Sequence, residues 1–435
     1  MTGLKKIGLN SAWMLIGYAF RTLSAFITSV LVARYLGPEG FGEMNYVFSF
    51  VILFSVFSGV GINQFLRREF VAHPEKGGVY LGTALVLRFL GSLIALALIF
   101  SCGELASGNE QTRWLIAIYS ISLIFTITDL SQVLLEAHLQ SKYVTLSVII
   151  QMSIFLVLKI LFIYLKAPLV AFVALQTVEI LLKSIVQFIC ISILKICPAL
   201  RWSTDVAKYL LMESWPFFLA GSAVMVYQRV DLVMLGKMDS GPGVGHYAVA
   251  ARISDLVSFL PYIISRSVFP ALTKAKHRSA AEFNESMMKF SAVMFWGMTV
   301  VALLITLLVK WPFILFFGSE YAPAVSVISI LAWKNVFMAL GIVCGEWILL
   351  AGLHRYAPIR SGVALVVNIV LNLFLIPVWG ADGAAFASLL AAFVNCVVML
   401  AIIPCYRECL RVMVAGIFLG PMKFRKQQFT GAPDE

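Results

Sequence analysis

Long runs of apolar residues dominate this chain and limit what it can fold into. The sequence has 435 residues, of which 61% are hydrophobic and 13% are charged, whereas roughly 25% charged residues is usual for a soluble domain. A helix needs about 20 apolar residues to cross the hydrocarbon core of a bilayer. We therefore predict an all-α integral membrane protein with twelve transmembrane helices, at residues 10–36, 44–66, 79–101, 113–135, 143–165, 168–194, 208–236, 245–272, 288–310, 323–350, 358–378 and 382–405.

The basic residues outside these spans or at their ends predict the orientation in the membrane. With a cytoplasmic N-terminus, the inside segments carry twenty Lys and Arg residues and the outside segments carry five. Basic residues concentrate in cytoplasmic loops, so we expect both termini to be cytoplasmic. The first apolar run is too long for a cleaved signal peptide and is expected to stay in place as the first helix.

The segments between the spans carry no recognisable catalytic or metal-binding chemistry. No phosphate loop and no His-Glu-x-x-His motif occurs, and the seven cysteines are scattered without metal-ligand spacing. We therefore expect a transporter rather than an enzyme, with no cofactor and no metal. The net charge of +11 is explained by membrane topology, so no nucleic-acid partner is expected.

Two pairs of similar segments indicate an internal repeat. LVARYLGPEGFGEMNYV (Leu31–Val47) resembles LVMLGKMDSGPGVGHYAVA (Leu232–Ala250), and LLEAHLQSKY (Leu134–Tyr143) resembles ILLAGLHRY (Ile348–Tyr356). Six helices followed by six with the same orientation predict two lobes, with substrate at the repeat interface. The expected domains are an N-terminal six-helix lobe (1–200), a C-terminal six-helix lobe (201–406) and a basic cytoplasmic tail (407–435).

Eight basic residues lie in the interior of the predicted spans, away from their ends, where a cation is costly unless protein or a water-filled cavity shields it. The acids in the spans are fewer, so the spans carry net positive charge, and arginine binds phosphate through a planar fork of donors. A structural role is an open alternative for three lysines: Lys159, Lys183 and Lys334. The candidate substrate-binding residues are the five arginines Arg21, Arg88, Arg229, Arg252 and Arg266.

Polar residues recur at three- and four-residue spacing in several spans, which places them on one helix face. The first span has Asn10, Gly17 and Arg21 on such a face. In the sixth span Glu179 precedes Lys183 by four residues, the spacing of an intrahelical ion pair. Such stripes suit a shared hydrophilic cavity, with helix–helix hydrogen bonding as the alternative. Asp231 and Asp255 are candidates for a coupling proton or for balancing an arginine.

Two motifs resemble those of a known family. LVARYLGPEGFGEMNYVFSF (Leu31–Phe50) and NLFLIPVWGADGAAFASLLA (Asn372–Ala391) are similar to turns in polysaccharide transporters of the multidrug/oligosaccharidyl-lipid/polysaccharide (MOP) exporter superfamily, including Wzx-type O-antigen flippases. The resemblance implies two six-helix lobes in a V around a cationic cavity. It also implies an undecaprenyl-pyrophosphate-linked oligosaccharide as substrate, moved by alternating access from the cytoplasmic to the periplasmic leaflet of the bacterial inner membrane.

The expected partners are the lipid-linked oligosaccharide, the bilayer, and polysaccharide polymerase and chain-length proteins. A proton gradient, a sodium gradient and the membrane potential stay open as driving forces. A drug or cation antiporter of the same fold is the first alternative, and the positive spans argue against it. A membrane polysaccharide polymerase or ligase is the second, and the short outside segments argue against it.

Overall fold

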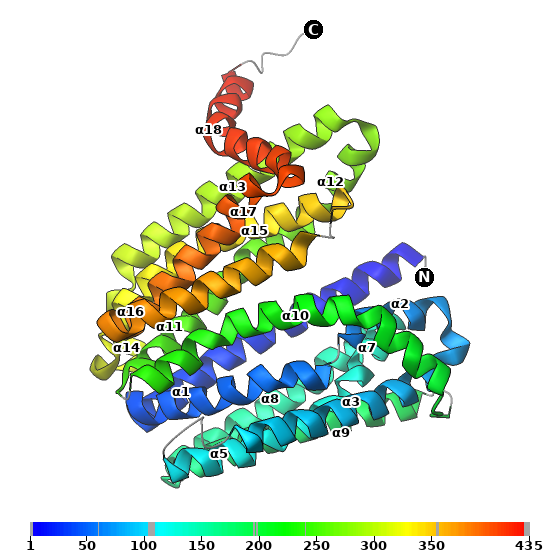
Figure 1. The fold of residues 1–435 in the computed structure, drawn as a ribbon, viewed down its shortest axis with the longest axis vertical. Coiled ribbons are helices and arrows are strands. Elements are labelled where there is room, and N and C mark those ends of the chain that lie inside the picture. The colour runs from blue at the N-terminus through cyan, green and yellow to red at the C-terminus, as the bar shows by residue number, and fades with distance from the viewer. Residues whose placement is uncertain are drawn as a thin grey trace. The chain divides into compact units, whose positions relative to one another are not determined.

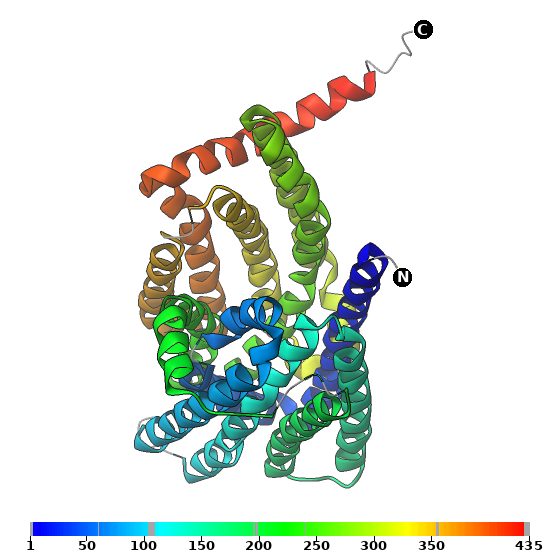
Figure 2. The same cartoon turned by 90° about the vertical axis from the view of Figure 1, so that its right-hand side faces the viewer.

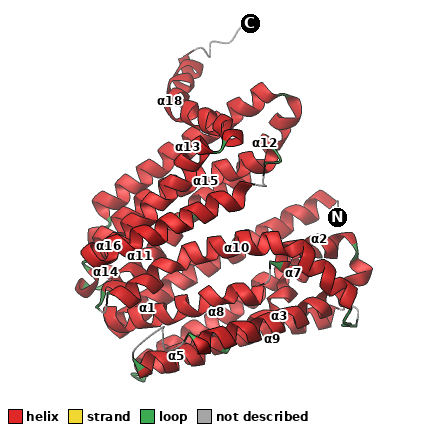
Figure 3. Cartoon of the chain, in the orientation of Figure 1, coloured by secondary structure: helices red, strands yellow, loops and turns green. Residues whose placement is uncertain are grey.

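The structure is a computed structural model that describes residues 3–59, 61–102, 109–194, 196, 199–239, 241–353 and 356–429. Within these residues every regular element is a helix, as Figure 3 shows. The chain forms two compact units, Met1–Gly245 and His246–Glu435. The all-α fold class is therefore confirmed.

The first unit consists of helices that pack around α1 and α9 (Figure 1). Its elements are α1 (Gly3–Gly59), α2 (Ile62–Ala72), η1 (Pro74–Lys76), α3 (Gly77–Ser101), α5 (Glu110–Ser120), α6 (Ser122–Phe125), η2 (Thr126–Asp129), α7 (Leu130–Ala137), α8 (Ser141–Tyr164), α9 (Leu169–Leu194) and α10 (Thr204–Met238). The contacts group α10 with this unit, whereas the predicted lobe boundary at residue 200 assigns it to the second lobe. That boundary stays a prediction.

The second unit has a core in which α13 and α15 lie side by side, as both Figure 1 and Figure 2 show. Phe283, Met287 and Trp347 are among its buried apolar residues. Its elements are α11 (Gly243–Val257), whose first turn contains the boundary, α12 (Phe259–Arg278), α13 (Ala280–Leu308), α14 (Lys310–Phe317), η3 (Ser319–Tyr321), α15 (Ala324–Leu350), α16 (Ala357–Phe393), η5 (Val394–Val398), α17 (Met399–Ile402), η6 (Pro404–Tyr406) and α18 (Arg407–Phe429).

Two glycines interrupt the longest helices where the sequence predicts turns. Gly37 has φ 69° and ψ 175° inside α1, and Gly380 has φ 53° and ψ −126° inside α16. Side chains other than glycine rarely adopt positive φ. Each long helix is thereby divided into two segments, close to the predicted ends of spans at residues 36 and 378.

Nine helical stretches of the described chain are long and apolar enough to cross a membrane. Two of them, Ala12–Gly59 and Pro358–Ile402, contain the interruptions at Gly37 and Gly380. The helix α10, which corresponds to the predicted seventh span, is not among the nine.

The two segments that the sequence matched as repeats contact each other inside the first unit. A Cβ atom on Gly42 would lie 2.8 Å from the Gly245 backbone nitrogen, and one on Gly245 would collide with the Pro38 carbonyl. A Cβ on Gly236 would likewise collide with the Tyr46 ring. Gly42 and Gly245 are therefore required for close backbone approach, and Gly236 leaves room for the Tyr46 ring.

Candidate functional site

The predicted fourth span, 113–135, lies in one helical stretch, Glu110–Ala137, whose regular α-helical hydrogen bonding is broken by a 3₁₀ segment. It consists of α5, α6, the 3₁₀ turn η2 and α7, although it contains neither Gly nor Pro. Ser and Thr side chains in it bond to backbone carbonyls three residues earlier, a local contact that competes with helix formation. These bonds are Ser120 to Ala117 (2.8 Å), Thr126 to Leu123 (2.8 Å) and Thr128 to Phe125 (2.9 Å).

The break leaves carbonyl groups at membrane depth that need donors from elsewhere in the protein. Helices α3 and α9 supply them through Ser92 to Leu123 (3.1 Å), Arg88 to Thr126 (2.9 Å) and Ser184 to Phe125 (2.8 Å). In transporters, interrupted helices with polar surroundings commonly form binding sites. The broken helix is therefore the first candidate site, which we call the η2 site and define by Arg88, Thr126, Asp129 and Lys183.

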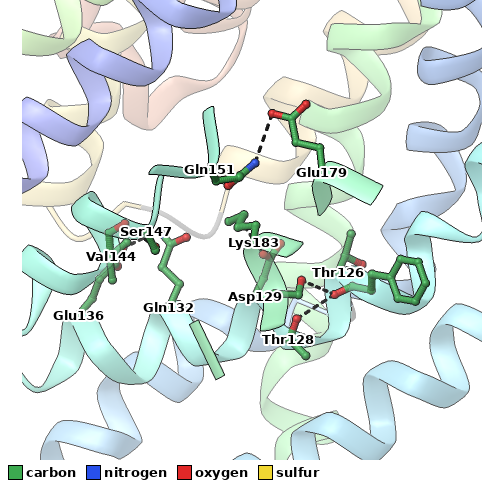
Figure 4. Close-up of polar contacts among 12 residues, drawn as sticks. Thr126, Thr128, Asp129, Gln132, Glu136, Val144, Ser147, Gln151, Glu179 and Lys183 are labelled. Atoms are coloured by element: carbon green, nitrogen blue, oxygen red, sulfur yellow. Dashed lines mark hydrogen bonds and ion pairs between the residues drawn. The ribbon is translucent and has the colours of Figure 1, made fainter. Parts of the chain in front are cut away.

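An ion pair connects η2 to α9. Lys183 Nζ lies 2.8 Å from Asp129 Oδ1, and the two side chains are 22% and 35% exposed. Figure 4 shows Asp129 and Lys183 next to each other, with Thr126 and Thr128 close by. Because the pair is partly exposed, it is accessible to exchange with other charges or water.

A second ion pair lies about one turn earlier on α9. Lys159 of α8 donates to Glu179 Oε2 at 2.8 Å, and the side chains are 10% and 7% exposed. Gln151, also on α8, donates to the other carboxylate oxygen at 3.3 Å, the contact drawn in Figure 4. The intrahelical pairing of Glu179 with Lys183 suggested by their spacing is therefore wrong for this structure, since each residue pairs with a different helix.

Arg88 is the most buried of the five candidate arginines, with 6% exposure. Its Nη1 donates to the Thr126 carbonyl, and its Nε has no hydrogen-bond partner in the described part of the chain. Asp129, three residues after Thr126, is the carboxylate whose charge acts on it. These contacts tie α3 to the broken helix, and a role in substrate binding stays a prediction.

The other candidates in the first unit differ in exposure. Arg21 is exposed on α1, Arg229 is half-buried on α10, and Asp231 is buried at 3% exposure. The polar face that contains Arg21 packs partly on α8, because Asn10 accepts from the Ser141 backbone N–H at 2.9 Å. Part of that stripe is thus used in helix–helix contact, which was the alternative interpretation.

The second unit holds the remaining candidates on α11 and α12. Arg252 is half-buried and Asp255 is exposed. The exposed Arg266 donates through Nε to the Tyr262 hydroxyl at 3.2 Å, and its guanidinium lies 5.2 Å from the centre of the same ring. Arg266 also lines a pocket of about 530 Å³ together with Glu346 and Arg360.

Sequence reasoning missed two features of these sites. Arg360, at the start of the predicted span 358–378, was counted with the inside basic residues and not as a candidate, but α16 begins at Ala357 and brings Arg360 into the wall of the pocket. Asp129 was not a candidate residue, and no pattern in the sequence indicates its pairing with Lys183. The cluster of Ser and Thr between Ser120 and Thr128 was the available signal for the helix break.

Long apolar helices that carry ion pairs between them define a multi-pass membrane protein. The profile of the family described as polysaccharide biosynthesis protein matches residues 7–276, and the chain belongs to that family. It is 25% identical over 402 residues to a putative O-antigen transporter from Shigella flexneri, with 87% of this chain and 93% of that protein covered.

Two groups of solved structures share the fold. A structure of the lipid II flippase MurJ in an inward closed conformation has a TM-score of 0.71 and 16% identity, covering 97% of this chain and 93% of that one. An inward-facing multidrug resistance MATE transporter of the MOP superfamily has a TM-score of 0.66 and 15% identity, covering 96% and 99%. Together with the family match, these findings confirm the resemblance to MOP-superfamily polysaccharide transporters.

Proposed function

We propose that the protein is a flippase that moves a lipid-linked oligosaccharide, carried on undecaprenyl pyrophosphate, from the cytoplasmic to the periplasmic leaflet of a bacterial inner membrane. The family match and the full-length similarity to a putative O-antigen transporter support this proposal. O-antigen or a similar surface polysaccharide is the expected product. The protein is proposed to act by alternating access and to perform no covalent chemistry.

The observation that carries the proposal is how the intramembrane charges pair. Lys159 and Lys183 are neutralised by Glu179 and Asp129. Arg88 and Arg266 instead bind a carbonyl and a phenol, which bring no negative charge. Of these four basic residues, the two that form no ion pair with a described carboxylate are arginines, and arginine is the side chain best suited to a pyrophosphate.

The proposed substrate-binding residues are the arginines on α1, α3, α10, α11 and α12, with the two aspartates as charge balance or as carriers of a coupling proton. The proposed topology has twelve spans and two cytoplasmic termini. It is obtained by dividing the two interrupted helices at Gly37 and Gly380 and by counting α10 as a span. Polymerase and chain-length proteins are the proposed partners on the periplasmic side. The proposed substrate-binding residues are Arg21, Arg88, Arg229, Arg252 and Arg266, and the two aspartates are Asp231 and Asp255.

Complementation in cells tests this proposal. In a strain that lacks its own transporter, wild type should restore surface polysaccharide, and Arg21→Ala or Arg252→Ala should abolish it at normal protein level. Arg34→Ala, an exposed arginine on the same helix as Arg21, is the matched control and should complement. Full complementation by both test variants contradicts the assigned residues, and export of cationic dyes without polysaccharide favours the antiporter.

A further inference from the structure

We propose that the pocket in the second unit is a loading subsite for the phosphate-bearing head group of the lipid-linked substrate. This inference rests on the proposed function and adds a specific place and two residues, Arg360 and Glu346, to it. The pocket holds about 530 Å³, which lies in the usual range of ligand pockets, about 300–1,000 Å³.

The charged lining of the pocket suits an anion. Arg266 comes from α12, Glu346 from α15 and Arg360 from α16, so three helices each contribute one charged group. Two guanidinium groups and one carboxylate give a net positive lining. Ser265 donates to Glu346 Oε1 at 2.6 Å, which fixes the carboxylate on the α12 side.

The hydrogen-bonding capacity of the Arg360 guanidinium is poorly satisfied by the described residues. Its Nη1 donates to the Cys344 sulfur at 2.7 Å, and a thiol is a weak acceptor. Its Nε is buried with no hydrogen-bond partner among the described residues. A buried donor without a partner is costly, so this arginine has more to gain from an incoming anion than one that is already paired.

Tyr262 holds the Arg266 side chain in place, and the terminal nitrogens of the guanidinium stay available to bind an anion. Its contact with Tyr262 uses Nε and the face of the ring, whereas a phosphate is bound in a bidentate manner by the terminal nitrogens. Phe269 and Leu349 line the same pocket and offer apolar contact to the part of the lipid next to the phosphates.

The location fits the step at which substrate is captured. The pocket involves the last turns of α15, the first turn of α16 and residues 262–269 of α12, which lie in the second half of the helical stretch Gly243–Arg278. All three belong to the end of the second unit that the positive-inside rule assigns to the cytoplasm, where the lipid-linked substrate would be loaded. Glu346 keeps the net charge low, so that binding is weak enough to be reversed during transport.

Direct binding to the purified full-length protein tests the subsite. The probe is undecaprenyl diphosphate in detergent micelles, with Kd measured for wild type, Arg266→Ala, Arg360→Ala and Glu346→Gln. Each arginine variant should weaken binding about tenfold or more, the size expected for losing a charged hydrogen bond. Glu346→Gln should tighten binding, because it removes the negative charge while keeping the acceptor for Ser265.

The opposite signs separate binding from folding, because a damaged pocket would weaken binding in all three variants. Arg278→Ala is the control: Arg278 is exposed at the end of α12 and pairs with Glu282 at 2.9 Å, so its Kd should equal that of wild type. Unchanged Kd values for Arg360→Ala and Glu346→Gln overturn the subsite, while transport by wild type in cells leaves the proposed function standing. Absence of binding by wild type, together with absence of transport, overturns both.

Two further probes identify the source of the phosphate. Inorganic diphosphate should bind more weakly than the lipid but with the same dependence on Arg360, because it lacks the apolar contact. Nanodiscs rich in phosphatidylglycerol should not displace undecaprenyl diphosphate. Equal affinity for free diphosphate and for the lipid, or displacement by phosphatidylglycerol, contradicts a site for the lipid-linked substrate.

Discussion

Lys159 donates to Glu179 at 2.8 Å between α8 and α9, although Lys183 lies one turn after Glu179 on the same helix. Lys183 does not pair with Glu179, because it binds Asp129 on η2. Two ion pairs therefore connect α9 to two different neighbours. This arrangement fixes α9 between α8 and η2 and removes both lysines from the charge available to substrate.

The buried ion pair between Lys159 and Glu179 predicts that loss of one partner strongly lowers the stability of the protein. Lys159→Met should destabilise the protein by about 3–5 kcal/mol, because it leaves Glu179 buried without its counter-ion. Thermal unfolding of the purified protein in detergent measures this. The double variant Lys159→Met/Glu179→Leu should recover most of the loss.

The exposed pair of Lys289 and Glu285, 2.9 Å apart, gives the matched control. Lys289→Ala should cost less than about 1 kcal/mol, as is usual for surface ion pairs. A loss for Lys159→Met no larger than that for Lys289→Ala would contradict the structural role of the buried pair.

The ion pair between Asp129 and Lys183 predicts that exchanging the two residues restores stability that each single exchange loses. Asp129→Lys and Lys183→Asp should each lower stability by about 1–2 kcal/mol, because each brings like charges together at η2. The double exchange should restore much of the stability, since it recreates an ion pair of opposite orientation. Melting temperatures of the three variants test this, and additive losses in the double variant would refute the pairing.

Arg88 and Arg21 should respond differently to the same substitution. Arg88→Ala removes the donor to the Thr126 carbonyl and should cost about 1–3 kcal/mol of stability. Arg21 is exposed, so Arg21→Ala should leave the melting temperature unchanged while it abolishes transport. Equal melting temperatures for Arg88→Ala and wild type would show that the contact to η2 is dispensable.

The glycine contacts between the repeated segments predict intolerance to a single methyl group. Gly245→Ala should destabilise the first unit by about 1–3 kcal/mol, because the new Cβ would meet the Pro38 backbone, which has no rotamer to change. Gly297, in the middle of α13, has nothing within 4 Å of its Cβ position, so Gly297→Ala should be neutral or stabilising. Equal stability of the two variants would argue against the close approach.

Backbone features with a local cause were predictable from the sequence. The turns at Gly37 and Gly380 were expected because Gly next to Pro or after Ile-Pro ends a helix, and both residues have positive φ. The all-α fold was predictable from the length of the apolar runs. The repeated turns were predictable from their Gly and Pro residues. Each of these depends on residues close together in the chain.

Partner choice inside the membrane was not predictable, because it depends on which helices pack together. Glu179 has one lysine at helical spacing and another twenty residues earlier in the chain, and only tertiary packing selects Lys159. The break at η2 was missed because Ser and Thr interrupt a helix less obviously than Gly or Pro. Arg360 was missed because it lies at the end of a predicted span, and the sequence does not show which side chains of neighbouring helices it meets there.

Transport by the purified protein tests the central claim most directly. Proteoliposomes should contain the full-length protein and an undecaprenyl-pyrophosphate-linked oligosaccharide, and an external glycosidase or lectin reports how much glycan reaches the opposite leaflet. We predict rapid translocation by wild type and by Arg34→Ala, and translocation at the rate of protein-free liposomes by Arg252→Ala. Equal translocation by wild type and Arg252→Ala, or none above protein-free liposomes for wild type, would contradict a flippase that uses arginine to bind the pyrophosphate.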